Sequence, residues 1–422
     1  MSIKLPSGLP AQHTLRAEGI DLIGRAAPEA REIRPLQVGL LNLMPEKAIT
    51  ETQFARLLGA SPFEVELTLF VPDDYASRNT SAEHLASFYR PWSRIKERTF
   101  DGLIVTGAPV ETLAFEEVRY WRQLTDIFDW TQSNVGRSYY ICWAAQAAMH
   151  HFHGVPKHCL REKLFGVYPH RLLQPTSPLL RGFDAEFPVP VSRHTEIREA
   201  DLPSAARLEV LAQSSESGLC LIEDQALNGT YMFNHLEYDT NTLADEYLRD
   251  LRAGKAIGPP RHYYPDDDPA QPPRNGWRPY AHLLFPNWLG ELHRRSVAGR
   301  ADEEMMTWLL AEPRPCGAGP DQSSDFLIYA SASPDPTPAL LRRLADERLS
   351  PLALKVHSRG GGLLVELRTD PLSETAAEHV AKALLKCAGV RKVTYRNSDG
   401  GAGIFIGPIA AAAAQSRRPT LH

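Results

Sequence analysis

Residues 138–152, SYYICWAAQAAMHHF, are the stretch of the sequence that decides the fold. An apolar run ending at Ile141 predicts a buried strand, and residues 144–152 have the pattern of a helix. Cys142 lies where the strand turns into the helix. Such a turn exposes a side chain above the edge of a sheet, and the N-terminus of the helix stabilises a thiolate there. Cys142 is therefore a candidate nucleophile, with a buried structural cysteine as the alternative.

Strands and helices alternate on both sides of this segment. Strands are predicted at residues 36–43, 63–70, 100–105, 138–141, 208–212, 218–223 and 230–233. Helices are predicted at residues 50–58, 120–131, 144–152, 242–252 and 283–295. Alternation at this spacing is typical of an α/β fold with a doubly wound, mostly parallel sheet. Ligands of such sheets bind beyond the carboxyl ends of the strands, where Gly107 and Cys142 both lie.

The composition of the chain excludes several classes of function. Its 46 basic and 51 acidic residues give a formal charge of -5, so we expect no binding to nucleic acid or to an anionic membrane. No apolar run reaches the roughly 20 residues needed to cross a bilayer, and the N-terminus lacks the pattern of a secretory signal. The five cysteines form no Cys-x-x-Cys pair, which argues against a disulfide framework or a structural zinc site. We expect a cytoplasmic protein without a metal.

The chain divides into segments of different composition. An N-terminal lead, residues 1–34, precedes the main α/β domain at residues 35–300. Residues 312–324, EPRPCGAGPDQSS, have the Pro, Gly and Ser content of a linker. The elements predicted within residues 325–409 follow the order βαββαβ, which is that of a small α+β ferredoxin-like domain. Residues 410–422, rich in alanine and then polar, are predicted to form a flexible tail.

A histidine and a carboxylate follow the last predicted strand of the main domain. His235 lies at the end of this strand and can reach a thiol above the same edge of the sheet, while Glu237 can fix the tautomer of the imidazole. A single histidine at a strand end is more often an ordinary surface or core residue, but His-x-Glu combined with the Cys142 turn is a specific pattern. The backbone N–H groups of Trp143 and of the turn at Ala108 are candidates to bind an oxyanion.

This combination of a cysteine turn and His-x-Glu resembles the class I glutamine amidotransferase-like fold. Within that fold, the chain resembles the homoserine O-succinyltransferase and O-acetyltransferase family over roughly residues 1–297. The matching segments are residues 40–45 (LLNLMP), 78–80 (RNT), 106–109 (TGAP), 142–144 (CWA), 162–163 (EK), 166–168 (GVY), 235 with 237–239 (H and EYD), 243–250 (LADEYLRD) and 287–288 (NW). Several of these motifs are specific to the family.

The resemblance implies a two-step acyl transfer in methionine biosynthesis, carried out by residues 35–300. Cys142 would take the acyl group from an acyl-CoA, and His235, oriented by Glu237, would then deprotonate the hydroxyl group of L-homoserine. Arg249 would bind the α-carboxylate of homoserine. No cofactor is implied besides the acyl-CoA substrate, and we expect a homodimer.

Three further residues are given a role by the resemblance. Lys163 and Ser192 match positions that contact the acyl group. Glu111, two residues after TGAP, matches the position where glycine accompanies succinyl transfer and glutamate accompanies acetyl transfer. A carboxylate there would fill space and repel the terminal carboxylate of a succinyl group, so Glu111 favours acetyl-CoA as the donor. An ordinary loop acid is the alternative.

Other functions stay open at this point. One alternative is the same transferase with succinyl-CoA as the donor or serine as the acceptor. A glutamine-hydrolysing amidase and a regulatory binding protein without catalysis are the alternatives from other classes. The chain also departs from its family, since many members read Gly-His-Pro-Glu where this chain has Asn234 and Leu236. The C-terminal domain lies outside the usual length of the family, and its order of elements resembles ligand-sensing domains of the ACT type. A role in dimerisation or solubility fits it equally well.

Two clusters are discounted as metal sites. His150 and His153 share a helix face, but no third ligand accompanies them, so a solvated helix face is the better interpretation. The aspartates at residues 266–268 lie in a Pro-rich segment that predicts a solvated turn.

Overall fold

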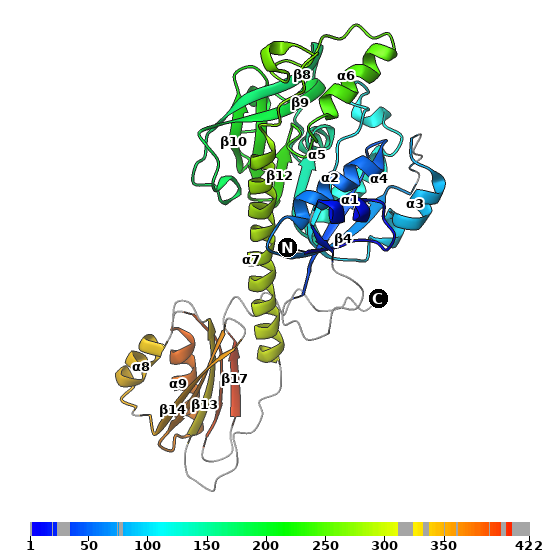
Figure 1. The fold of residues 1–422 in the computed structure, drawn as a ribbon. Coiled ribbons are helices and arrows are strands. Elements are labelled where there is room, and N and C mark those ends of the chain that lie inside the picture. The colour runs from blue at the N-terminus through cyan, green and yellow to red at the C-terminus, as the bar shows by residue number, and fades with distance from the viewer. Residues whose placement is uncertain are drawn as a thin grey trace. The chain divides into compact units, whose positions relative to one another are not determined.

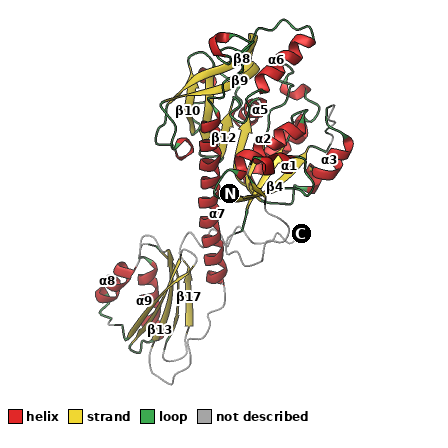
Figure 2. Cartoon of the chain, viewed as in Figure 1, coloured by secondary structure: helices red, strands yellow, loops and turns green. Residues whose placement is uncertain are grey.

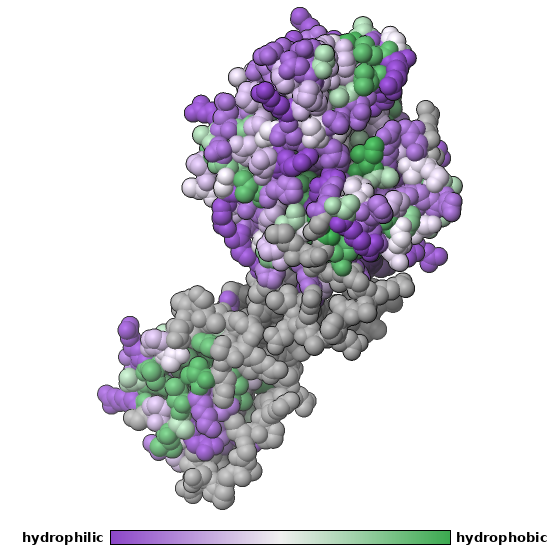
Figure 3. All heavy atoms as spheres, viewed as in Figure 1, coloured by the Kyte–Doolittle hydropathy of each residue, from purple (hydrophilic) through white to green (hydrophobic). Residues whose placement is uncertain are grey.

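The computed structural model of the chain describes residues 2–18, 20–22, 34–73, 75, 79–310, 324–331, 337–349, 351–359, 362–387, 389–397 and 402–406. The chain folds as two compact units, Met1–Arg295 and Ser296–His422 (Figure 1). Among the described residues, no helix is long and apolar enough to cross a membrane. On the face of the larger unit shown in Figure 3, hydrophilic side chains cover most of the surface and hydrophobic ones form scattered patches.

A large, mostly parallel sheet forms the centre of the larger unit. Its parallel part, in spatial order, consists of β2 (Asp21–Leu22), β1 (Ser2–Lys4), β4 (Glu64–Val71), β3 (Leu36–Leu41), β6 (Phe100–Val105), β7 (Val135–Ile141) and β12 (Gly229–Met232), with β5 (Arg90–Pro91) paired to β4. Neighbouring strands in this part run parallel, as in the pairings of Ile104 with Tyr139 and of Tyr139 with Thr230. Their carboxyl ends therefore meet at one edge of the sheet.

Antiparallel strands extend the sheet beyond β12. They are, in spatial order, β11 (Gly218–Asp224), β10 (Leu208–Ser214), β8 (His158–Leu172) and β9 (Glu186–Glu196). The hairpin of the two long strands β8 and β9 has a register shift between Cys159 and Leu164, where β8 bends. An irregularity of this kind increases the local twist of a strand, so the hairpin is curved.

Helices cover both faces of the sheet, because the side chains of the buried strands alternate between two cores. On β7, Tyr139 and Ile141 belong to the core that includes α1 (Ala11–Ala17), α2 (Lys47–Gly59) and the first half of α7 (Arg278–Leu310). Tyr140 belongs to the opposite core, with α4 (Trp121–Asn134) and α5 (Trp143–His153). Figure 2 shows these helices around the strands. Burial of a large apolar side chain contributes roughly 1.5–3 kcal/mol, so two such cores hold the sheet firmly.

The remaining helices of the larger unit are short or peripheral. They are α3 (Ala82–Phe88), α6 (Thr242–Arg252) and the 3-10 helices Trp92–Arg94, Phe115–Glu117, Pro178–Leu180, Glu199–Asp201 and Pro265–Asp267. The side chain of Ser81 accepts a hydrogen bond from His84 N and caps the N-terminus of α3.

The smaller unit is an antiparallel sheet with two helices. Its strands lie in the order β14 (Ala353–Arg359), β15 (Gly362–Thr369), β13 (Ser324–Ser331), β16 (Val390–Arg396) and β17 (Ala402–Ile406). The helices α8 (Thr337–Asp346) and α9 (Glu374–Leu385) share one hydrophobic core with β13, β15 and β16. The βαββαβ order predicted from the sequence is present, followed by the additional strand β17.

The fold class predicted from the sequence is confirmed: a doubly wound, mostly parallel α/β sheet and a small α+β domain. Two features differ from the sequence analysis. The lead at residues 1–34 contributes β1, which pairs with β4, and the β8–β9 hairpin was not predicted. The linker predicted at 312–324 lies outside the described residues except for Ser324, and the tail at 410–422 lies outside them entirely.

Candidate active site

Cys142 occupies a strained turn between β7 and α5. Its backbone has φ of 52° and ψ of -119°, a conformation that residues with a Cβ atom rarely adopt. Flanking hydrogen bonds fix this turn: Cys142 N donates to Met232 O at 2.7 Å, and Cys142 O accepts from Gln146 N at 3.2 Å. The side chain is consequently placed at the carboxyl edge of the sheet, before the first residue of α5.

The loop after β6 lies directly against this turn. A Cβ atom added to Gly107 would lie 3.2 Å from Cys142 Cβ and 3.7 Å from its Sγ atom, closer than ordinary van der Waals contact for the first of these. A glycine at position 107 therefore permits the close approach of the two loops. Ala108 and Trp143, whose N–H groups were predicted to bind an oxyanion, are both buried and lie next to Gly107 and Cys142 in the chain.

His235 and Glu237 come together next to Cys142. His235 N donates to Pro190 O at 2.9 Å, and its Nδ1 atom lies 2.6 Å from Glu237 Oε1. Burial acts to lower the pKa of His235, but the charges of Glu237 and Cys142 outweigh it, so the pKa is well above its ordinary value. The thiol, the imidazole and the carboxylate are thus buried and close enough to interact electrostatically.

Glu246 on α6 links this chain to the predicted substrate-binding residues. Lys163 Nζ on β8 and Ser192 Oγ on β9 both donate to Glu246 Oε2, at 3.0 and 2.6 Å. The hydroxyl of Tyr238 donates to Glu246 Oε1 at 3.0 Å, and the Tyr238 ring stacks on His235 with centroids 4.2 Å apart. Burial acts to raise the pKa of Glu246, but Lys163 and Ser192 hold it below its ordinary value, so Glu246 is a half-buried carboxylate anion.

Arg249 lies one turn of α6 beyond Glu246 and is more open to solvent. Its side chain is 60% exposed and forms an ion pair with Asp250, with Nε 3.2 Å from Oδ1. Asp250 Oδ2 in turn lies 3.6 Å from Lys163 Nζ. The predicted binding residues Lys163, Ser192 and Arg249 thus gather around one turn of α6.

We expect that Glu246→Gln raises the KM for the acyl acceptor by roughly 10- to 100-fold, because a charged hydrogen-bond acceptor is worth about 1.5–3 kcal/mol. The substitution keeps the size of the side chain but removes the charge that orders Lys163 and Ser192. Steady-state kinetics with the acceptor varied would measure it. Asp245→Asn, on the exposed neighbouring residue, is the matched control. An acceptor KM that is equal in the two variants would contradict this role for Glu246.

Glu111 lies in the loop that follows Gly107 and faces β9. Its Oε2 atom lies 3.5 Å from Thr195 Oγ1, and Thr195 Oγ1 donates to Gln146 Oε1 on α5 at 2.8 Å. The backbone carbonyl of Glu111 accepts a hydrogen bond from Lys157 Nζ at 2.6 Å. The carboxylate is therefore placed between the helix that begins at Cys142 and the strand that carries Ser192.

The side-chain oxygen and nitrogen of Asn234 both have partners in a buried polar network. Its Oδ1 atom accepts from Arg193 Nη1 at 2.5 Å, and its Nδ2 group donates to His170 Nε2 at 3.0 Å. Ser217 Oγ also lies 3.0 Å from His170 Nε2, while the Nδ1–H of His170 donates to Tyr168 O. Burial lowers the pKa of His170 to about 4, so the imidazole is neutral and able to accept. The network holds the residue that precedes His235.

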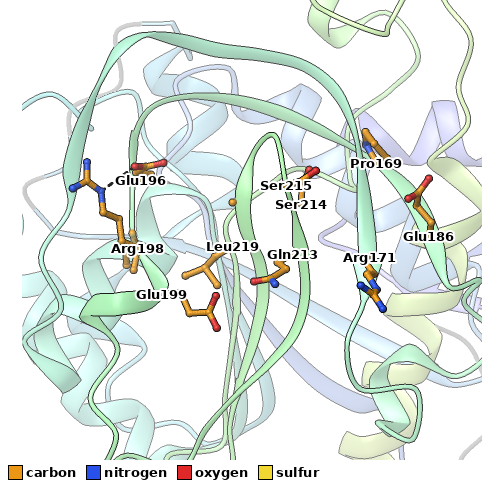
Figure 4. Close-up of a pocket in the computed structure, with 12 residues that line it drawn as sticks. Pro169, Arg171, Glu186, Glu196, Arg198, Glu199, Gln213, Ser214, Ser215 and Leu219 are labelled. Carbon is orange, nitrogen blue, oxygen red and sulfur yellow. Dashed lines mark hydrogen bonds and ion pairs between the residues drawn. The ribbon is translucent and has the colours of Figure 1, made fainter.

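A hollow of about 540 Å3 lies beneath the curved β8–β9 hairpin (Figure 4). The charged side chains that line it are Arg171, Glu186, Glu196, Arg198 and Glu199. Arg198 Nε and Glu196 Oε1 form an ion pair at 3.2 Å, which Figure 4 marks with a dashed line. With three glutamates for two arginines, its lining is suited to neither an anion nor an apolar ligand.

The clustered histidines on α5 lie next to carboxylates. His150 pairs with Glu116, His151 with Asp129 and His153 with Asp224, so that each histidine has a different partner. Within the part of the chain that the structure describes, no group of three or more His, Cys, Asp and Glu side chains could hold a metal ion.

The larger unit is thus a doubly wound α/β domain with a cysteine, a histidine and a glutamate at the carboxyl edge of its sheet. The sequence pattern of the homoserine O-succinyltransferase family matches residues 2–296, and the chain belongs to this family. It is accordingly an acyltransferase.

Similar proteins fall into two groups. A homoserine O-acetyltransferase of Rhizorhabdus wittichii is 55% identical over 295 residues, which are 70% of this chain and 92% of the relative. A homoserine O-acetyltransferase of Rhizobium rhizogenes is 52% identical over 294 residues, 70% of this chain and 96% of the relative. A crystal structure of a glutamine amidotransferase from Thermotoga maritima is 11% identical, with a TM-score of 0.41, over 62% of this chain and 99% of that one.

Proposed function

We propose that the chain transfers an acetyl group from acetyl-CoA to the hydroxyl of L-homoserine through an acetyl-Cys142 intermediate, in the biosynthesis of methionine. The observation that carries the proposal is the buried chain of Cys142, His235 and Glu237 at the carboxyl edge of the sheet, with Nδ1 of His235 2.6 Å from Glu237. Nucleophile, base and orienting carboxylate are the parts that this chemistry needs.

In the first half-reaction, the sulfur of Cys142 attacks the carbonyl carbon of the thioester. Cys142 gives its proton to His235, whose raised pKa makes it a good acceptor. The oxyanion that forms on the carbonyl oxygen is bound by backbone N–H groups of Trp143 and Ala108. When the intermediate collapses, the bond to the CoA sulfur breaks, His235 returns the proton to it, and CoA leaves as the thiol.

In the second half-reaction, the hydroxyl of homoserine attacks the acetyl-cysteine. His235 takes the hydroxyl proton and passes it to the departing sulfur of Cys142, while Glu237 keeps the imidazole in the required tautomer. Arg249, whose side chain is exposed, binds the α-carboxylate of homoserine in two hydrogen bonds. The charged Glu246, with Lys163 and Ser192, forms the neighbouring polar wall.

Acetyl-CoA is proposed as the donor because of Glu111. The matching family pattern is named for succinyl transfer, whereas the similar proteins are named for acetyl transfer. The choice between acetyl-CoA and succinyl-CoA therefore has to rest on a residue of the acyl pocket. Glu111 Oε2 lies 3.5 Å from Thr195 Oγ1, which donates to Gln146 on α5, the helix that follows Cys142, and these contacts support a position of Glu111 near the nucleophile. A carboxylate there disfavours a succinyl group by charge and by volume.

Thiol release from acetyl-CoA and from succinyl-CoA, each with homoserine or serine as the acceptor, tests the proposed function. We expect release from acetyl-CoA with homoserine to be the fastest of the four reactions. Faster release from succinyl-CoA would contradict the donor, and faster release with serine would contradict the acceptor. Absence of release together with ammonia formation from glutamine would instead favour an amidase.

A further inference from the structure

A second hollow, of about 700 Å3, lies at the carboxyl end of β4. Its wall begins at Val71, the last residue of β4, and continues through α3 to the residues around the 3-10 helix Trp92–Arg94. The proposed mechanism uses none of the residues that line it. Its position at the carboxyl edge of a doubly wound sheet is where ligands of such folds bind.

The lining of this hollow is cationic. Arg90, Arg94 and Arg98 all line it, and the side chains of all three are exposed. Arg98 Nη1 donates to Thr68 Oγ1 at 3.3 Å, whereas the side chains of Arg90 and Arg94 have no hydrogen-bond or ion-pair partner among the described residues. Among the described residues of the lining, the one carboxylate is that of Asp73, which accepts hydrogen bonds from Ser93 N and Gln123 Nε2. Two guanidinium groups are therefore available to bind an anion, and their planar forks suit phosphate.

The hollow under the β8–β9 hairpin does not share this property. There, three glutamates face two arginines, and Arg198 is already paired with Glu196. A ligand with several phosphate charges would be repelled by the glutamates under the β8–β9 hairpin and attracted by the arginines at the end of β4.

Apolar and aromatic side chains complete the wall of the cationic hollow. Tyr75, Leu85, Tyr89 and Ile95 line it beside the arginines. The hydroxyl of Tyr75 donates to Leu43 O at 3.0 Å, so that this ring is fixed in place. A fixed aromatic ring next to guanidinium groups is the combination that binds a heterocyclic base attached to phosphates.

The distance from this hollow to Cys142 suits a long ligand. In the sheet, β4 is followed by β3, β6 and β7, all parallel, so the carboxyl ends of β4 and β7 are three strand spacings, or about 14 Å, apart. Aromatic contacts connect the hollow with Cys142. The ring centroids of Tyr75 and Tyr120 are 5.9 Å apart, and those of Tyr120 and Trp143, the residue after Cys142, are 6.4 Å apart. An acyl-CoA has this layout, with a nucleotide and an acyl thioester separated by a long pantetheine arm.

We propose that the hollow lined by Arg90, Arg94 and Arg98 binds the phosphate-bearing adenosine end of the acyl-CoA donor, while the pantetheine arm runs along the carboxyl edge of the sheet to Cys142. The proposal rests on the proposed acyl transfer and adds to it the site that recognises the donor's nucleotide.

The test compares two donors that differ only in this end of the molecule. In the variant Arg90→Gln/Arg94→Gln, we expect kcat/KM for acetyl-CoA to fall about tenfold or more, chiefly through KM, because charge-assisted bonds to phosphate are lost. With acetyl-pantetheine, which lacks the nucleotide, kcat/KM should be unchanged. Arg207→Gln is the matched control, since the exposed Arg207 precedes β10, at the other end of the sheet from β4.

Other outcomes would overturn the proposal. An unchanged KM for acetyl-CoA would show that the arginines do not meet the donor, and an equal loss with both donors would show a general effect on the fold. Direct binding separates these results from a failure of the proposed function. In calorimetry, adenosine 3',5'-bisphosphate should bind the full-length wild type and the Arg207→Gln variant but not the double variant, even if neither donor is turned over. Equal binding to all three proteins would overturn the proposal.

Discussion

Replacing Cys142 by alanine is expected to lower the rate of acyl transfer by at least about 10⁴-fold, the size of loss seen when a catalytic nucleophile is removed. The chain should stay folded, because Cys142 contributes little apolar surface and its backbone bonds to Met232 and Gln146 do not involve the side chain. Thiol release from acetyl-CoA measures the rate, and circular dichroism during heating measures the fold.

A second measurement identifies the intermediate. Incubation of the wild type with acetyl-CoA alone should raise the mass of the intact protein by one acetyl group, and the Cys142→Ala variant should show no increase. Cys159→Ala is the matched control, because Cys159 is an exposed free cysteine outside the turn. Turnover at the wild-type rate in Cys142→Ala would rule out the nucleophile, and loss of turnover in both variants would point to an unspecific effect.

Glu111→Gly is expected to shift the donor preference from acetyl-CoA towards succinyl-CoA. Removal of a like charge from the acyl pocket is worth several kcal/mol, so the ratio of kcat/KM for the two donors should change by at least about 100-fold. Initial rates with each donor at a fixed homoserine concentration measure this ratio.

Glu111→Gln separates the two ways in which the carboxylate can act. The glutamine keeps the volume of the side chain and its position near Thr195 but carries no charge. If repulsion dominates, the glutamine variant should accept succinyl-CoA almost as well as the glycine variant; if volume dominates, it should behave as the wild type does. A donor ratio that stays at the wild-type value in the glycine variant would contradict the role of Glu111.

The fold and the centre of the site follow from local sequence patterns. A strand that runs directly into a helix at Cys142 predicts the turn, and the strand before His235 predicts the position of the imidazole at the same edge. Both patterns are short-range, because burial on each face of the sheet imposes them on neighbouring residues. The positions that the structure gives these residues, with Glu237 2.6 Å from His235, are those that the patterns lead one to expect.

Features that depend on distant parts of the chain were not predictable in this way. Along β8, polar residues, a glycine and Pro169 interrupt any alternation, and the strand is defined by its pairing with β9 and not by its own pattern. Glu246 looks like an ordinary helix residue, and only the tertiary structure brings Lys163 and Ser192 to it. Glu246 does lie inside a family motif at residues 243–250, but the motif alone does not indicate what the residue does.

Arg193, fully buried, is an interior cation whose hydrogen bonds go to neutral groups: Asn234 Oδ1 and the carbonyl oxygens of Phe233 and Ser217. No carboxylate of the described residues forms an ion pair with it. A buried cation without a counter-ion costs folding free energy, and it acts as a permanent electrostatic field that needs no rearrangement during a reaction. In the proposed mechanism, negative charge that develops on the sulfur of Cys142 would be attracted by Arg193, because the two side chains interact electrostatically. Burial of Arg193 therefore lowers the folding stability of the larger unit, and in return its positive charge is in position before a substrate binds.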